Sequence, residues 1–195
     1  MSTAADLIRV RGVGGTTLDD VVSTSKVSKS QLYRHFEDKP ALVRAVIEYV
    51  GDRKIDGERE RLENVRTFAG LRRWRDAIVE TNALQDGRYG CALGSLANEV
   101  ADNDWVARLK LNELFDAWIE LFRVVLRRFQ EERIIPPSVD VEQLAIGFVA
   151  AVQGGYLLAQ TARDVAPMAS AIDMAIAHLE LLSRVNEDTL NELLA

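Results

Sequence analysis

A cluster of hydroxyl, amide and basic side chains near the N-terminus has the chemistry of contacts to a DNA duplex. Gln31 can bond adenine through two hydrogen bonds, and Lys29 can donate to guanine or to a phosphate. Hydroxyl groups suit phosphate oxygens, and they are carried by Tyr33, Ser28 and Thr17. The ten candidate DNA contacts are Thr17, Lys26, Ser28, Lys29, Ser30, Gln31, Tyr33, Arg34, His35 and Lys39.

Two short helices must position this cluster. Thr17-Leu18-Asp19-Asp20 and Ser28-Lys29-Ser30-Gln31 both have capping-box spacing, and they predict helices over 17–25 and 28–36. Only Ser25-Lys26-Val27 joins the two helices, which is helix-turn-helix geometry. In such a unit the second helix enters the major groove and its N-terminal residues meet base edges.

One face of the second helix must hold it to the rest of the domain. Leu32 and Phe36 are four residues apart, so they share that face. Lys39 sits at the start of the next helix, where its charge and the free N–H groups of the first turn face the same DNA backbone. Pro40 is compatible with that first turn.

The rest of the chain also has helical periodicity, because apolar residues recur at three- and four-residue spacing. We therefore expect an all-α protein. Its three-helix helix-turn-helix DNA-binding domain covers 1–49, and a helical ligand-binding and dimerisation domain covers 50–195. The predicted helices are 3–11, 17–25, 28–36, 39–62, 67–84, 94–101, 104–133, 138 or 140 to 163, 168–184 and 187–194. The charged run 51–66 is interpreted as a solvated helix exit or hinge.

Residues 16–48 resemble the DNA-binding domain of the TetR family of repressors. The family pattern is T-x-x-x-I/V, followed by V-S-x-x-x-L-Y-x-H-F-x-x-K-x-x-L. Its matches here are Thr17 through Val21, Val27-Ser28, Leu32-Tyr33, His35-Phe36, Lys39 and Leu42. Residues 89–126 resemble the ligand-binding domain of the branch that contains multidrug-efflux repressors.

The chain departs from the family pattern at two places. The family usually has Gly where this chain has Lys26, and a left-handed backbone there would cost a non-Gly residue about 1 kcal/mol. The first helix is also short for the family, which leaves open an upstream start or a truncated helix.

The resemblance implies a homodimer with its interface on the C-terminal helices. Residues 144–162 contain no charge over nineteen positions, so we expect this helix to be buried against its own core and against a second copy. A transmembrane span is the alternative, which three Gly, two Gln and the lack of a basic flank argue against. The interface residues we expect are Phe148, Ala151, Gly155, Leu158, Ile172, Ala175, Ile176 and Leu179.

Large aromatic residues in the C-terminal region could form ordinary core or the wall of a cavity for a small apolar or aromatic effector. Cys91 is either a small buried residue or a thiol sensor. The candidate effector contacts are Trp74, Ile78, Cys91, Trp105, Asn112, Phe115, Trp118, Phe122, Gln153 and Tyr156.

Composition excludes several classes of protein. The net charge of −6 argues against a general nucleic-acid coating protein, yet Lys and Arg outnumber Asp and Glu by five to two within residues 26–44. A single Cys excludes a disulfide framework, and two His leave little for a metal site. No apolar secretory signal begins the chain, so we expect a cytoplasmic protein.

These features together favour a ligand-responsive transcriptional regulator. We expect a repressor dimer that binds a palindromic operator, with half-sites about one DNA turn (~34 Å) or a multiple of it apart, and leaves it when the effector binds. The alternative is a helical ligand-binding or interaction module without sequence-specific DNA binding. No nucleophile or metal cluster accompanies His35 in the sequence, so we expect neither an enzyme nor a cofactor.

Overall fold

The computed structural model describes residues 1–84 and 90–184. Within these residues the secondary structure is helical without strands, which confirms the expected all-α class. The helices are α1 (Ser2–Arg11), α2 (Leu18–Thr24), α3 (Lys29–His35), α4 (Lys39–Leu62), α5 (Phe68–Ala83), α6 (Ala92–Val100), α7 (Trp105–Glu131), α8 (Val141–Ala162) and α9 (Ala166–Arg184). Their ends lie within two residues of the predicted ends when α8 is compared with the later of its two predicted starts, residue 140. The tail helix expected over 187–194 falls outside the described residues.

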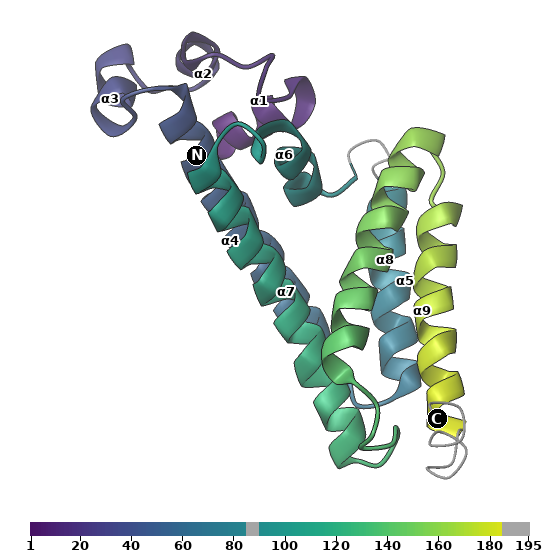
Figure 1. Cartoon of the computed structure of the whole chain (residues 1–195). Helices are drawn as coiled ribbons and strands as arrows, with labels where there is room; N and C mark the ends of the chain where they lie inside the picture. Colours follow the sequence, from purple (N-terminus) through teal and green to yellow (C-terminus); the bar gives the residue numbers. More distant parts are fainter. Residues whose placement is uncertain (85–89, 185–195) are drawn as a thin grey trace. The chain divides into compact units, whose positions relative to one another are not determined.

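The chain packs as two compact units. The first unit comprises residues 1–56 and 91–116, and the second comprises residues 57–90 and 117–195. The helix-turn-helix, the first part of α4, α6 and the start of α7 therefore belong to the first unit (Figure 1). The second unit contains α5, α8, α9 and the rest of α7. The domain boundary expected after residue 49 stays a prediction.

The first unit is built around apolar residues of α4. Leu42, Val43, Val46 and Ile47 have almost no exposed surface, and they recur at the spacing of one helix face. Gly51 continues this face, and a Cβ added there would overlap the side chain of Leu114 on α7. Glycine therefore permits the close approach of α4 and α7 within this unit.

The second unit has an aromatic core. Trp118 and Phe122 of α7 are fully buried, and the Phe122 ring lies 5.1 Å from Trp74 of α5 and 5.2 Å from Phe148 of α8 between centroids. α9 packs against both α8 and α5. At Gly155 an added Cβ would come within 2.8 Å of the Met168 backbone, so this glycine sets the spacing of α8 and α9.

The charged run 51–66 is not solvated along its whole length, and in this respect the sequence interpretation is wrong. Glu58 has no exposed surface and accepts a hydrogen bond from Trp74 Nε1 at 2.9 Å and another from Arg61 at 3.2 Å. A buried carboxylate is stable only when such donors replace its water. The spacing of Ile55, Glu58 and Leu62, which puts all three on one helix face, was the available signal.

α8 is long and apolar enough to cross a membrane by length and composition alone. Within its most apolar stretch, 39% of the residues are buried inside the protein. A core helix passes the same test, so hydropathy does not distinguish a membrane span from a helix that packs on protein.

Candidate nucleic-acid interface

The capping box predicted at the start of α2 is present. Thr17 Oγ1 accepts the backbone N–H of Asp20 at 3.1 Å, and Asp20 Oδ2 accepts the backbone N–H of Thr17 at 2.8 Å. The Thr17 hydroxyl also donates to the Asp20 carboxylate, and these bonds from Thr17 lower the pKa of Asp20. The cap ends the preceding loop and fixes where α2 begins.

The second capping box starts α3. Ser28 Oγ accepts the backbone N–H of Gln31 at 3.3 Å, while Gln31 Oε1 accepts the backbone N–H of Ser28 at 3.0 Å and its hydroxyl at 2.9 Å. Ser28 and Gln31 are therefore structural residues as well as candidate DNA contacts. The turn between the helices avoids the strain considered for Lys26, because the positive φ angles of non-glycine residues in the described part of the chain are at Arg133 and Arg163.

Leu32 anchors α3 and leaves the opposite side of the helix in solvent. Leu32 is 6% exposed, whereas every other residue from Lys29 to His35 is exposed. At 100° per residue, Ser30 and Arg34 lie opposite Leu32, and Tyr33 and Gln31 flank them. The structure thus places most of the predicted contacts around one short, exposed helix.

Lys29 of α3 is held by a residue of α2. Its Nζ lies 2.9 Å from Asp19 Oδ1 and 5.6 Å from the centroid of the Tyr33 ring. The hydrogen bond and the charge of Asp19 raise the pKa of Lys29 above its ordinary value. The sequence analysis did not identify Asp19 as a partner of Lys29, although Asp19 lies within the predicted capping segment Thr17-Leu18-Asp19-Asp20.

Two basic side chains of the helix-turn-helix are available to phosphates. Lys26 and Arg34 are exposed, and neither forms an ion pair with any residue in the part of the chain that the structure describes. His35 is exposed beside them. Arg34 is the stronger candidate for a base contact, because its guanidinium matches two acceptors of guanine and it lies opposite the anchoring Leu32.

Lys39 begins α4, and it is half-buried. Its Nζ lies 3.4 Å from the carbonyl oxygen of Gly14, which is a weak contact that a phosphate could replace. Asp38 Oδ1 accepts the backbone N–H of Ala41 at 2.8 Å, so one N–H of the first turn is already satisfied. At the start of α4, the Lys39 ammonium is therefore a better candidate to bind a phosphate than the backbone N–H groups are.

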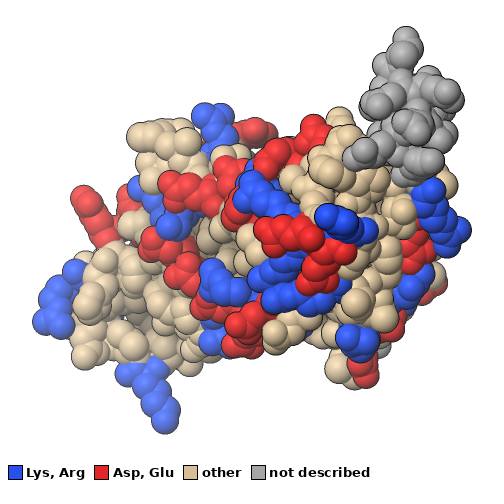
Figure 2. Space-filling view, turned by 90° about the horizontal axis from the view of Figure 1, so that it is seen from below, with Lys and Arg blue, Asp and Glu red and all other residues tan. Residues whose placement is uncertain are grey.

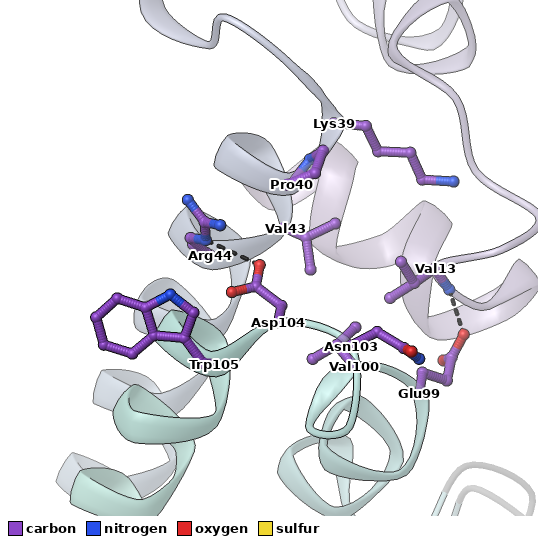
Figure 3. A pocket seen from close by; sticks show the side chains of 10 residues that line it. All are labelled: Val13, Lys39, Pro40, Val43, Arg44, Glu99, Val100, Asn103, Asp104 and Trp105. Carbon is purple, nitrogen blue, oxygen red and sulfur yellow. Dashed lines mark hydrogen bonds and ion pairs between the residues drawn. The ribbon is translucent and has the colours of Figure 1, made fainter.

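Two carboxylates join α6 and α7 to the residues around the helix-turn-helix (Figure 3). Glu99 accepts the backbone N–H of Val13 at 2.6 Å. Asp104 accepts the N–H of Ala107 at 3.0 Å and Arg44 Nε of α4 at 2.8 Å. These donors, first the Ala107 N–H, lower the pKa of Asp104. These bonds tie the loop at Val13 to α6 and the Arg44 side chain of α4 to the start of α7, within the first unit.

An open cavity of about 360 Å³ lies in the first unit between these elements. Trp105, which is 66% exposed, stands at its edge opposite Val13, and Val43 points into it from α4 (Figure 3). Among the ten candidate effector contacts, Trp105 is the one that lines this cavity.

The other candidate effector contacts fall into two groups. Cys91, Asn112 and Phe115 belong to the first unit with Trp105, where Cys91 is buried and Asn112 is an exposed residue that donates to Asp116 at 2.9 Å. The members in the second unit are Trp74, Ile78, Trp118, Phe122, Gln153 and Tyr156. Five of these six are buried, and Gln153 is half-buried. The buried Glu58, which accepts a hydrogen bond from Trp74, was not predicted from the sequence.

The residues expected at a dimer interface are mostly turned inward. Five of them are almost completely buried within the protomer and so face its own core instead of a second copy: Phe148, Gly155, Ile172, Ile176 and Leu179. Ala151 and Ala175 are half-buried, and Leu158 is exposed. The exposed large apolar residues of the two helices are Ile146, Leu157 and Leu158 of α8 with Met174 and Leu181 of α9. That α8 and α9 form the interface stays a prediction, and the sequence did not show which side of each helix is free.

Charge is mixed over one face of the protein. Basic and acidic side chains are interspersed on the face that Figure 2 displays, with no extended area of one sign. Arg72 and Arg75 of α5 pair with Glu180 and Asp173 of α9. Nowhere in residues 1–84 and 90–184 do three or more His, Cys, Asp or Glu gather as a metal site.

Two family models match the chain. Residues 1–46 match the model described as bacterial regulatory proteins, tetR family, and residues 65–175 match the tetracyclin repressor-like C-terminal domain. The second match alone covers more than half of the chain.

Relatives and solved structures agree with these matches. The chain is 29% identical over 161 residues to the HTH-type transcriptional repressor DhaR of Mycobacterium sp. (strain GP1), covering 81% of this chain and 79% of the relative. It is 26% identical to the uncharacterized HTH-type transcriptional regulator Rv0196 of Mycobacterium tuberculosis, over 85% of this chain and 84% of the relative. The regulatory protein TetR from Rhodobacter sphaeroides has the same fold, with a TM-score of 0.81 at 20% identity over 91% of this chain and 95% of that one.

Proposed function

Because the chain belongs to the TetR family, whose members are DNA-binding transcriptional regulators that act as dimers, we propose that it is a repressor released from a palindromic operator by a small apolar or aromatic effector. The exposed face of α3, with Arg34 and Tyr33 outward and Leu32 inward, is the observation that carries the DNA-binding part of this proposal. The proposal contains no catalytic step, and it places the protein in the cytoplasm with its DNA.

The contacts divide into two kinds. Lys26, Lys39 and the Tyr33 hydroxyl bind phosphates, which supply affinity for any sequence. Ser30 and Arg34 face the base edges, and Arg34 donates two hydrogen bonds to a guanine. Selectivity therefore depends on fewer side chains than affinity does.

The dimer forms through the exposed apolar side of α8 and α9. Leu157 and Leu158 are each 57% exposed, and Gly154 between the turns has no atom within 4 Å of an added Cβ. Exposed apolar residues of this size on adjoining helices are typical of an interaction surface. A second copy of the chain covers it, in keeping with the dimers of the family.

The effector binds among the aromatic residues of the second unit. Trp74, Trp118 and Phe122 supply apolar surface, and Glu58 is a buried acceptor among them. These residues are packed together in the structure, so the effector must bind a conformer in which they separate. It releases the DNA only if it binds that conformer more tightly than the DNA-binding one. α4 contributes residues to both units, and we assign it the transmission of this change.

Selection from a pool of random DNA tests the proposal with the full-length protein. The expected result is an enriched site with two-fold symmetry, bound by a dimer at physiological salt. A screen for compounds that release this site then identifies the effector class. A chain that binds compounds but enriches no site is the alternative ligand-binding module, and that outcome refutes the proposal.

A further inference from the structure

Asp19 of α2 forms an ion pair with Lys29 of α3, one of the predicted DNA contacts. Its carboxylate lies 2.9 Å from Lys29 Nζ, and the side chains of Asp19 and Lys29 are 68% and 63% exposed. Asp20, by contrast, caps α2 and lies near Arg11. The Asp19–Lys29 pair therefore joins α2 to α3 in solvent, at the start of the helix assigned to the major groove.

This pair contributes little to folding. Two exposed side chains in high dielectric gain a small Coulomb energy and lose rotamer freedom, so such pairs are weak. Asp19 also lies in the first turn of α2, where an acidic residue favours the helix dipole, but Asp20 supplies a second carboxylate there. The consequence of the pair for DNA is larger, because it removes a cation from the charges that meet phosphates.

We propose that Asp19 is a specificity-determining residue that keeps Lys29 from binding phosphates and presents it to base edges. The inference rests on the proposed function and deepens it. In a non-specific complex, affinity comes from neutralised phosphates and released counterions. The Asp19–Lys29 pair has no net charge with which to neutralise a phosphate. If Lys29 binds a phosphate instead of Asp19, the Asp19 carboxylate is left unpaired beside the negatively charged duplex.

Binding to a guanine edge does not require the Asp19–Lys29 pair to separate. The Lys29 ammonium has three donors, so it can keep its bond to Asp19 and still donate to the O6 and N7 acceptors of guanine. The Tyr33 ring, 5.6 Å from Nζ, limits the directions in which Lys29 extends. Asp19 thus penalises random sequences more than a site with guanine at the matching position, which is selectivity by a repulsive element.

The test measures binding to the selected site and to random DNA over a series of salt concentrations. In the Asp19→Asn variant Lys29 is free to neutralise one more phosphate, so the slope of log affinity against log salt should steepen by about 0.9. Affinity for random DNA should rise about fivefold, and the ratio of specific to random affinity should fall by a similar factor. Asn keeps the size of the side chain and is tolerated at a helix start.

Three further variants serve as matched comparisons. Asp6→Asn removes the same charge from an equally exposed carboxylate, which is paired with Arg9 of α1, and should leave both slope and ratio unchanged. Lys29→Gln should weaken binding to the selected site without changing the slope. In the Lys29→Gln background, Asp19→Asn should no longer steepen it.

The outcomes separate this inference from the proposed function. If the wild-type protein selects a site and Asp19→Asn retains its slope and ratio, the inference is wrong while the function stands. The same holds if Asp6→Asn changes both quantities equally, since net charge alone then explains the effect. A wild-type protein that selects no site refutes both.

Discussion

The side-chain carbonyl of Gln31 accepts a hydrogen bond from the backbone N–H of Ser28 at 3.0 Å, and the amide that could bond adenine is therefore part of the cap of α3. Gln31 Oε1 also accepts the Ser28 hydroxyl. Adenine needs an acceptor as well as a donor from Gln31, so a base contact competes with the start of the helix that carries it.

Substitution of Gln31 should separate capping from DNA contact. Gln31→Ala removes the bond to Ser28 N–H and should lower the free energy of unfolding by about 0.5–1 kcal/mol. Gln31→Glu preserves the capping box and should unfold like the wild type, yet bind DNA more weakly because its charge meets phosphates. Urea unfolding and gel-shift titration measure the two effects. Equal stability of all three proteins would show that the cap bond contributes nothing.

Lys39 and Tyr33 should contribute to affinity through phosphates. Lys39→Ala should weaken operator binding and make the salt slope shallower by about 0.9, because one phosphate contact is lost. Tyr33→Ala should weaken binding about tenfold by losing a phosphate hydrogen bond and its packing beside Lys29. Neither change should alter dimerisation. Arg53→Ala, a cation about 21 Å further along α4, is the control and should leave the slope as it was. Unchanged affinity of both variants at fixed salt would contradict the assignment of α3.

The ionisation of Asp104 should make the free energy of unfolding depend on pH in the acid range. Its pKa is lowered below the ordinary value of 3.8, first by the N–H of Ala107 and also by Arg44, so the folded state favours the charged form. The stabilisation is therefore complete above pH 3.8 and is lost as the pH falls through the lowered pKa. Asp104→Asn should reduce the acid-induced loss of stability in thermal unfolding at pH 2–5. Identical profiles for the wild type and Asp104→Asn would contradict the prediction.

Leu157 should be required for dimerisation. Leu157→Glu places a charge on the exposed apolar side of α8, where burial against a second copy would cost several kcal/mol, so the variant should be monomeric where the wild type is dimeric. Sedimentation equilibrium measures the association. Leu109→Glu introduces the same charge at a 50% exposed leucine of α7 and should remain dimeric. A dimeric Leu157→Glu protein would place the interface elsewhere.

The sequence predicted the helices because their signals are local. The pattern of Ser28 to Gln31 contains both partners of its cap within four residues, and Pro40 sits within the first turn of α4, which begins at Lys39. The anchoring role of Leu32 also follows from its spacing with Phe36. Ends of helices and the inward side of an isolated short helix depend on neighbours in the chain, so one sequence suffices to find them.

Contacts between distant segments could not be found in this way. The sequence identified α8 as apolar all round, but only packing shows that Gly155 meets α9 while Leu157 stays in solvent. Glu58 was assigned to a solvated run because its partner Trp74 is sixteen residues away. Hydropathy by itself determined which segments must be buried. The tertiary structure decided which side of each segment is buried and which charges are paired. Burial and pairing depend on distances between residues far apart in the chain, and the order of residues does not determine those distances locally.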